Sequence, residues 1–191
     1  ETLLVSVRKE KRTYERMIKE LQEASNRLMH IIQESERKER EARKKKGGKT
    51  EDHDDDSEFA KFKGRLPWPV NGTVAIQYGS QVDPIFNLPV FRSGIHIKTQ
   101  GNIKVKAVHD GKVVFADEFK GYGLLVIVSH GGGYHTLYGN LSKIFLKNGV
   151  IIKEHEALGE TGDASAIGTT GMYFELRYKG KPLDPQQWLK K

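Results

Sequence analysis

The chain has 191 residues, of which 37% are hydrophobic, so it is long enough for one sizeable domain with an appendage. It contains no cysteine, which excludes disulfides and thiolate metal sites but leaves the cellular compartment open. The formal net charge of +7 suits an acidic partner, such as an anionic membrane or an anionic wall polymer. We expect no nucleic acid, because no recognition motif accompanies the basic run at residues 37–46. The first residue is not Met, so we expect an internal or processed piece of a longer protein.

Residues 1–46 contain neither Gly nor Pro and are predicted to form one long, coiled-coil-like helix. An isolated helix of this length is marginal in water, so we expect its apolar stripe to pack on another surface. That surface is a second coiled-coil strand, a partner protein or the chain's own globular domain. The stripe recurs at spacings of mostly four and three residues and comprises Leu3, Val7, Tyr14, Met17, Leu21, Ala24, Leu28 and Ile31.

Residues 47–58 have the composition of a charged, flexible linker, in which an acidic run follows the basic run of the helix. Attraction between the two runs would fold the linker back along the helix. This motivates a regulatory hypothesis, in which residues 31–62 dock over the functional groove of the domain and block it.

The composition changes at Phe59, and residues 59–191 are predicted to form one mainly β domain, a sandwich or an open barrel. Two runs, 113–115 and 124–128, are apolar at every position, so we expect strands that are buried on both faces. The predicted strands are Thr73–Tyr78, Gly94–Lys98, Val105–Ala107, Lys112–Ala116, Gly123–Ser129, Gly133–Tyr138 and Tyr173–Tyr178.

Three segments of this domain carry a family pattern. Residues 88–97 read LPVFRSGIHI and residues 168–177 read GTTGMYFELR. They resemble the motifs H-x-G-x-D and S-T-G-x-H-L-H-F-E of the LytM-type, lysostaphin-like zinc endopeptidases. Residues 66–72 read LPWPVNG, which resembles the start of the LytM domain in EnvC-like murein hydrolase activators. The resemblance covers residues 59–189 and implies a LytM fold for the domain.

The zinc-binding side chains of that family are replaced here. The resemblance places Arg92 and Tyr173 at two ligand histidines and His96 at the ligand aspartate, while Gly171 and Asn140 replace the histidines that assist the metal-bound water. A guanidinium is always charged and has no lone pair to donate, so it repels a metal ion. We therefore predict a pseudo-endopeptidase that binds no metal and no cofactor.

With the metal lost, the resemblance implies a partner-binding groove in place of the active site. Aromatic and Met side chains suit an amphipathic helix, and Arg92 suits a carboxylate on a partner. By analogy, the groove would bind the regulatory helix of an N-acetylmuramoyl-L-alanine amidase and activate that enzyme during septum splitting. The residues expected to line it are Phe91, Arg92, His96, Tyr138, Asn140, Gly171, Met172 and Tyr173.

The same analogy gives the cellular setting and the other partners. It implies a protein of the Gram-negative periplasm, whose helical segment connects to a membrane division complex of the FtsEX type. Peptidoglycan is a further candidate ligand, and one alternative is a wall-binding or complex-bridging scaffold. A second alternative is a zinc peptidoglycan endopeptidase with atypical ligands, namely His96, His130 and His135.

Overall fold

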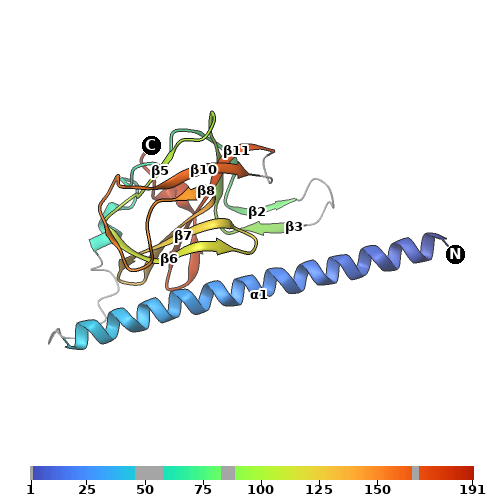
Figure 1. The fold of residues 1–191 in the computed structure, drawn as a ribbon, viewed down its shortest axis with the longest axis horizontal. Helices are drawn as coiled ribbons and strands as arrows, with labels where there is room; N and C mark the ends of the chain where they lie inside the picture. Colours follow the sequence, from blue (N-terminus) through green and yellow to red (C-terminus); the bar gives the residue numbers. More distant parts are fainter. Residues whose placement is uncertain (1, 46–57, 83–88, 165–167) are drawn as a thin grey trace.

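A computed structural model describes residues 2–45, 58–82, 89–164 and 168–191, which form a long helix lying beside a β domain (Figure 1). Within the helix, side chains are described from position 12 onward, apart from positions 14, 18 and 21. Of the predicted linker, 47–58, only the last residue lies within the described part of the chain.

Helix α1 (Thr2–Lys45) is uninterrupted, as expected from a segment without Gly or Pro. Its last turn holds Arg43, Lys44 and Lys45, whose positive charges stabilise the negative end of the helix dipole. The C-terminal half lies along β6 and β7, and the N-terminal part extends beyond the domain (Figure 1). None of the described helices is long and apolar enough to span a membrane.

The domain is built on one ten-stranded antiparallel sheet, whose two end strands, β1 and β9, each have one neighbour. The mainly β prediction is confirmed, and the sheet is open and not closed into a barrel. Its main path runs in space through β1 (Thr73–Ile76), β4 (Ile95–Lys98), β11 (Thr169–Tyr178), β10 (Ala157–Ala164), β8 (Tyr134–Ile144), β7 (Gly123–Gly131), β6 (Gly111–Phe119) and β9 (Ile151–Ile152).

Four short strands complete the domain. β12 (Lys181–Leu183) pairs with β11, and β5 (Lys104–Lys106) pairs with β10. β2 (Gly79–Val82) and β3 (Pro89–Arg92) form a separate two-stranded sheet that projects from the domain (Figure 1). Two 3-10 helices, η1 (Glu58–Phe62) and η3 (Pro185–Gln187), lie at the two ends of the domain's sequence.

The central strands β6 and β7 are covered on both faces, as their apolar runs predict. On one face, Val113, Val126 and Val128 belong to the main core of the domain. On the other face, Leu125 and Ile127 pack with Phe119 and Leu137 against two helix residues, Leu28 and Ile32, which are fully buried. Of the three surfaces considered for the helix stripe, the chain's own domain is the one that covers this part of it.

The two ends of the domain's sequence are joined to each other. The Leu66 N–H donates to the Trp188 carbonyl at 3.1 Å, and the Lys190 N–H donates to the Leu66 carbonyl at 2.8 Å. Phe59 is buried beside them, stacked on His130 with ring centroids 4.5 Å apart. This closure fixes the point at which the chain enters the β domain, next to the C-terminal end of its sequence.

Candidate partner-binding site

Two of the mapped zinc-ligand positions lie side by side on neighbouring strands. His96 on β4 is paired in register with Tyr173 on β11, and their ring centroids are 5.0 Å apart. Gly94 makes room for the phenol, because a Cβ there would approach the Tyr173 ring to 2.8 Å and the Phe174 carbonyl oxygen to 2.4 Å. The third position, Arg92, ends β3, and the Arg92 charge acts on His96. The three positions therefore form one site.

The site is electrostatically unsuited to a cation. Burial, with a smaller contribution from the Arg92 charge, lowers the pKa of His96 to about 4, so the imidazole is neutral at pH 7. Within the described residues, its Nδ1 atom is buried without a hydrogen-bond partner. Burial also raises the pKa of Tyr173 well above its usual value, so the phenol stays protonated. One neutral imidazole, a protonated phenol and a guanidinium do not fit the ligand set that zinc needs.

A line of polar side chains continues from Tyr173 along β11. The Tyr173 hydroxyl donates to the Glu175 carboxylate at 2.7 Å, and Arg177 Nε donates to the other Glu175 oxygen. Arg177 also donates to the Gly180 carbonyl at 2.9 Å. Glu175 is fully buried, and this burial raises its pKa even though Arg177 and Tyr173 favour the charged form. A buried carboxylate held this way keeps the Tyr173 ring in a fixed position.

All of these side chains project from the same face of the sheet. Paired residues of an antiparallel sheet share a face, and alternate residues of a strand do so too. Tyr173, Glu175 and Arg177 alternate on β11, and Arg177 pairs with His135 on β8, which pairs with Ser129 on β7. We call this surface the helix-covered face; it carries His96, Tyr173, Glu175, Arg177, Leu137, His135, Ile127 and Ser129.

Helix α1 lies on that face, along the part remote from His96. Met29 Sδ is 3.4 Å from an Arg177 nitrogen, and Ser35 Oγ is 3.5 Å from His135 Nε2. Further along the helix, the Ser129 hydroxyl donates to the Glu39 carboxylate. The sheet face that carries the mapped ligand positions therefore already holds an amphipathic helix, which belongs to the same chain.

Two predicted lining residues are not on this face. Met172 and Tyr138 are fully buried in the main core, because each adjoins a residue of the helix-covered face, Tyr173 and Leu137, and so points to the opposite side of the sheet. The Tyr138 hydroxyl is satisfied there, accepting from the Val108 N–H at 3.2 Å and from the Thr136 hydroxyl at 3.0 Å. Their burial contradicts the expectation that they line a groove, and they form no part of the site.

The other predicted residues lie on the β2–β3 hairpin and on strands β8 and β11. Phe91 is exposed on the hairpin, with its ring 5.3 Å from that of Tyr78. Asn140 has a positive φ of 56°, and its N–H donates to the Tyr122 carbonyl at 2.7 Å. Gly171 is buried on β11, two residues before Tyr173. Asn140 thus adjoins Tyr122, Gly171 lies on the strand of Tyr173, and Phe91 lies on the hairpin that ends at Arg92; a partner-binding role for these residues stays a prediction.

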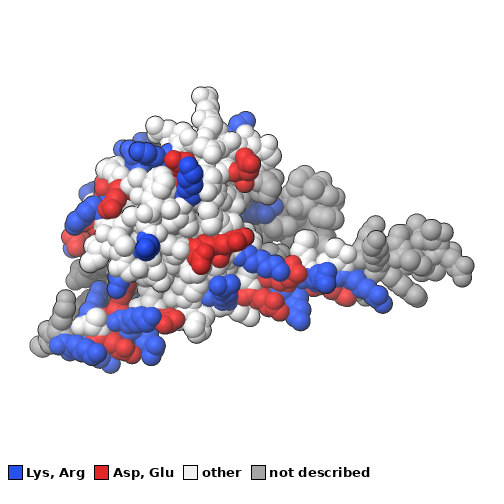
Figure 2. Space-filling view, viewed as in Figure 1, with Lys and Arg blue, Asp and Glu red and all other residues white. Residues whose placement is uncertain are grey.

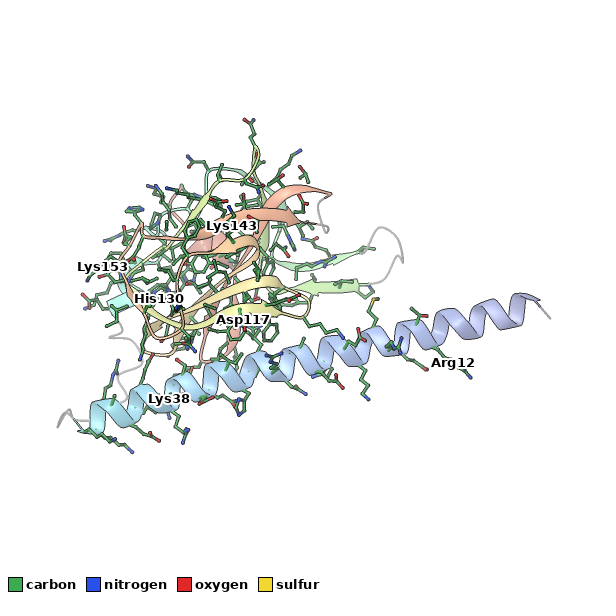
Figure 3. All side chains as sticks on the ribbon, in the orientation of Figure 1. Arg12, Lys38, Asp117, His130, Lys143 and Lys153 are labelled. Atoms are coloured by element: carbon green, nitrogen blue, oxygen red, sulfur yellow. The ribbon has the colours of Figure 1, made fainter. Side chains whose placement is uncertain are left out.

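The alternative zinc ligands do not converge. His135 faces α1, whereas His130 faces the core, where Phe59 stacks on it. Both His130 nitrogens are engaged, Nδ1 with the Asp110 carbonyl and Nε2 with the Thr136 hydroxyl, each at 2.7 Å. Figure 3 shows His130 inside the domain. In the described part of the chain, no three His, Asp or Glu side chains gather in a way that would hold a metal ion.

Several residues of the site were not predicted from the sequence. Tyr122 packs edge-on against Tyr173, with ring centroids 5.5 Å apart, and burial raises the pKa of the Tyr122 phenol above its usual value. Glu175 and Arg177 could have been found from their alternation with Tyr173, which places three polar residues on one face of a strand. No sequence signal pointed to Ser129 or His135, because their role depends on where α1 docks.

Comparison with known proteins agrees with this arrangement. The sequence profile of peptidase family M23 matches residues 90–185. The murein hydrolase activator EnvC of Escherichia coli is 33% identical over 127 residues, which cover 66% of this chain and 29% of EnvC. The cell division protein DipM of Caulobacter vibrioides is 29% identical over 134 residues, covering 66% of this chain and 21% of DipM.

The fold is also that of solved enzymes. The catalytic domain of lysostaphin from Staphylococcus simulans superposes with a TM-score of 0.56 and 22% identity, covering 63% of this chain and 94% of that domain. This likeness concerns the fold alone. The chain spans less than a third of the length of the two relatives.

Proposed function

We propose that this chain, which belongs to peptidase family M23, activates a murein hydrolase and does not itself cut peptidoglycan. The observation that carries the proposal is the position of α1, an amphipathic helix seated on the sheet face that includes His96 and Tyr173. A surface that accommodates one amphipathic helix has the shape and chemistry to accommodate another. We infer that the partner helix is the regulatory helix of an N-acetylmuramoyl-L-alanine amidase.

Along the direction of α1, the helix-covered face offers first apolar contacts and then polar contacts to a helix. Leu125, Ile127 and Leu137 form an apolar floor that accepts side chains one helical turn apart, as Leu28 and Ile32 illustrate. Polar partners follow at the end of this floor, where Ser129 and His135 meet helix residues. A partner helix with the same pattern would find every one of these contacts once α1 had left.

Arg92 gives the site its charge preference. It lies beside the neutral imidazole of His96 and is half-buried at the end of the β2–β3 hairpin. A guanidinium in such a place binds a carboxylate with paired hydrogen bonds, and each charge-assisted bond contributes about 1.5–3 kcal/mol. We therefore expect the partner helix to carry an acidic residue at this end.

The position of α1 also sharpens the regulatory hypothesis. The described contacts of the helix with the domain run from Glu20, whose carboxylate is 3.2 Å from Lys120 Nζ, to Arg43, which lies beside Gly131. They begin N-terminal to the 31–62 segment of that hypothesis and continue into it through Ile32, Ser35 and Glu39. We propose that α1 occupies the face in the resting state and that the amidase helix binds after α1 is displaced.

The cellular setting follows from the relatives as a proposal. A murein hydrolase activator acts where peptidoglycan lies, which in Gram-negative bacteria is the periplasm. The part of α1 that extends beyond the domain, where Arg12 lies, would connect to a membrane division complex of the FtsEX type (Figure 3). Direct binding to peptidoglycan stays a prediction.

An amidase assay tests the proposal. A purified amidase is incubated with dye-labelled sacculi, with and without this chain, and the released dye is measured. We expect stimulation with the wild-type chain and no release by the chain alone. Arg92→Glu should reduce the stimulation at least about tenfold, because it replaces an attractive charge pair with a repulsive one. Lys104→Glu, on the exposed strand β5, is the matched control.

Three results would contradict the proposal. The first is the release of dye by the chain without an amidase, and the second is the absence of both stimulation and binding. The third is equal stimulation by Arg92→Glu and wild type, which would exclude this site while leaving an activator role open. Circular dichroism of each variant separates lost binding from lost folding.

A further inference from the structure

One end of the domain combines protruding aliphatic side chains with unscreened positive charge. Ile151 on β9 is 75% exposed, which is the highest value among the large hydrophobic residues that the structure describes, and Val150 precedes it at 37%. Lys112 pairs with Ile151 in register, and Lys147 begins the turn that leads to Val150. Among the described residues, neither lysine forms a salt bridge.

The register places these residues beside the C-terminal end of α1. Lys112 pairs with Ile151 on one side and with Ser129 on the other, so the three share one face of the sheet. Ser129 is the residue that binds Glu39 of α1. One turn further along, the Arg43 guanidinium lies next to Gly131 at the end of β7. The helix thus brings its own cations to the row that ends at Ile151.

We call this surface the β9 end; it comprises Lys112, Lys147, Val150 and Ile151 together with Arg43 of α1. Figure 2 shows Lys and Arg side chains on the C-terminal part of α1, at the lower left of the view, with Asp and Glu side chains between them. Two acidic groups of this region pair with other cations, since Asp110 binds Lys153 Nζ at 2.7 Å and Glu41 lies 3.6 Å from Arg37. The surface is therefore basic with an exposed aliphatic centre.

We propose that the β9 end binds the surface of an anionic lipid bilayer. Aliphatic side chains ringed by Lys and Arg are the composition of an interfacial membrane contact, where the apolar part enters the headgroup region and the cations meet phosphates. Ile151 and Val150 stand on an edge strand and a tight turn, and such a protrusion fits a deformable lipid surface. An anionic wall polymer would bind the cations but would not need the exposed aliphatic side chains. The exposed Ile151 and Val150 therefore favour a lipid bilayer over a wall polymer.

The proposed membrane binding by the β9 end does not depend on the proposed activator role. If α1 stays docked at the membrane, its C-terminal end and the β9 end contact the bilayer together. Lys112 and Ile151 continue the row of Ser129 on the helix-covered face, whereas His96 and Tyr173 lie toward the other end of the strand order, on β4 and β11. The membrane contact and the mapped ligand positions are therefore separate parts of that face.

Co-sedimentation of the whole chain with vesicles tests the proposal. We expect binding to vesicles containing 30% phosphatidylglycerol in a phosphatidylcholine background, and little binding to pure phosphatidylcholine. Each lysine near the surface contributes a factor of about five, so Lys112→Gln with Lys147→Gln should weaken binding about 25-fold. Raising the salt to 0.5 M should release most of the protein, because it shortens the screening length.

The variant Ile151→Ser separates lipid from polymer. It should weaken vesicle binding at least about fivefold, since it removes the inserted side chain while leaving every charge in place. The matched controls are Val82→Ser, on the exposed hairpin, and Lys98→Gln, on β4, and both should bind vesicles as wild type does.

Three outcomes would overturn the proposal. They are equal binding to neutral and anionic vesicles, vesicle binding unchanged by Ile151→Ser, and retention on purified sacculi in the absence of any vesicle binding. The last would assign the cations to a wall polymer. Amidase stimulation in solution, measured on the same variants, should stay at the wild-type level, so failure here and failure of the activator proposal are distinguishable.

Discussion

The two faces of the central sheet are built in different ways. The core face is lined by apolar side chains such as Val126, Phe174 and Met172, and its few polar groups are fully paired. The helix-covered face has an apolar strip in its middle and buried polar groups on either side, including Glu175 and His135. The first arrangement is that of a permanent core. The second fits the proposal that the helix is exchanged for a partner, because buried polar groups can regain water when the helix leaves.

A truncation on the core face should have the largest effect on the whole domain. Phe174→Ala removes a fully buried ring that packs on Tyr138, with centroids 5.4 Å apart. We expect it to lower the free energy of unfolding by about 3–5 kcal/mol, measured by urea denaturation followed by circular dichroism. If the domain instead kept its unfolding free energy and only released α1, the distinction between the two faces would fail.

A truncation on the other face should loosen the helix and leave the domain folded. Leu28→Ala removes a fully buried side chain of α1, at a cost of about 2–4 kcal/mol to helix docking. Hydrogen exchange of the helix amides around position 28 should then accelerate on the order of 100-fold, while the amides of β8 keep their protection. Met17→Ala, on a half-exposed position of the same helix, is the control and should change neither.

A fall in pH should destabilise the folded chain through its buried histidines. Burial lowers the pKa of His96 and His135 to about 4 and that of His130 to about 3, below the unfolded value of 6.5. The unfolded chain therefore binds more protons below pH 6.5, and each histidine costs about 2 kcal/mol of stability at pH 5. Glu175 acts in the opposite sense, because its raised pKa favours protonation in the folded state.

His96→Asn isolates one part of this dependence. Between pH 7 and pH 5, the free energy of unfolding of the variant should fall by about 2 kcal/mol less than that of wild type, as measured by urea denaturation at both pH values. His155→Gln, at an exposed turn, should keep the wild-type slope. If the unfolding free energy of His96→Asn changed with pH as much as that of wild type, the pKa of His96 would not differ between the folded and unfolded states.

Much of the fold was open to prediction, and the failures have physical causes. The apolar runs of β6 and β7 predicted strands that are buried on both faces, but they did not predict that α1 covers the second face. β10 was missed because its sequence, ALGETGDA, lacks the β-branched and aromatic residues that indicate strands. β2 and β3 were missed because their residues alternate only between exposed and half-buried, so neither strand has the fully buried apolar face that a sequence pattern reveals.

The site was predicted in position more accurately than in composition. The family motifs located Arg92, His96 and Tyr173 correctly as neighbours. Met172 was assigned to the same surface because it adjoins Tyr173 in sequence, yet adjacent residues of a strand point to opposite faces. Ser129, His135 and Arg177 gain their role only from the docked helix, which sequence periodicity alone does not place.

The most direct test is to fix α1 on the sheet. The chain has no cysteine, so Ser35→Cys and His135→Cys create a unique pair, at positions whose side chains lie 3.5 Å apart, that a short reversible bis-thiosulfonate reagent can join. The account predicts that the crosslinked chain no longer stimulates an amidase on labelled sacculi and that reduction restores the stimulation. Each single-cysteine variant, treated with the same reagent, should stimulate throughout. Undiminished stimulation by the crosslinked chain would contradict the claim that α1 and the partner share this face.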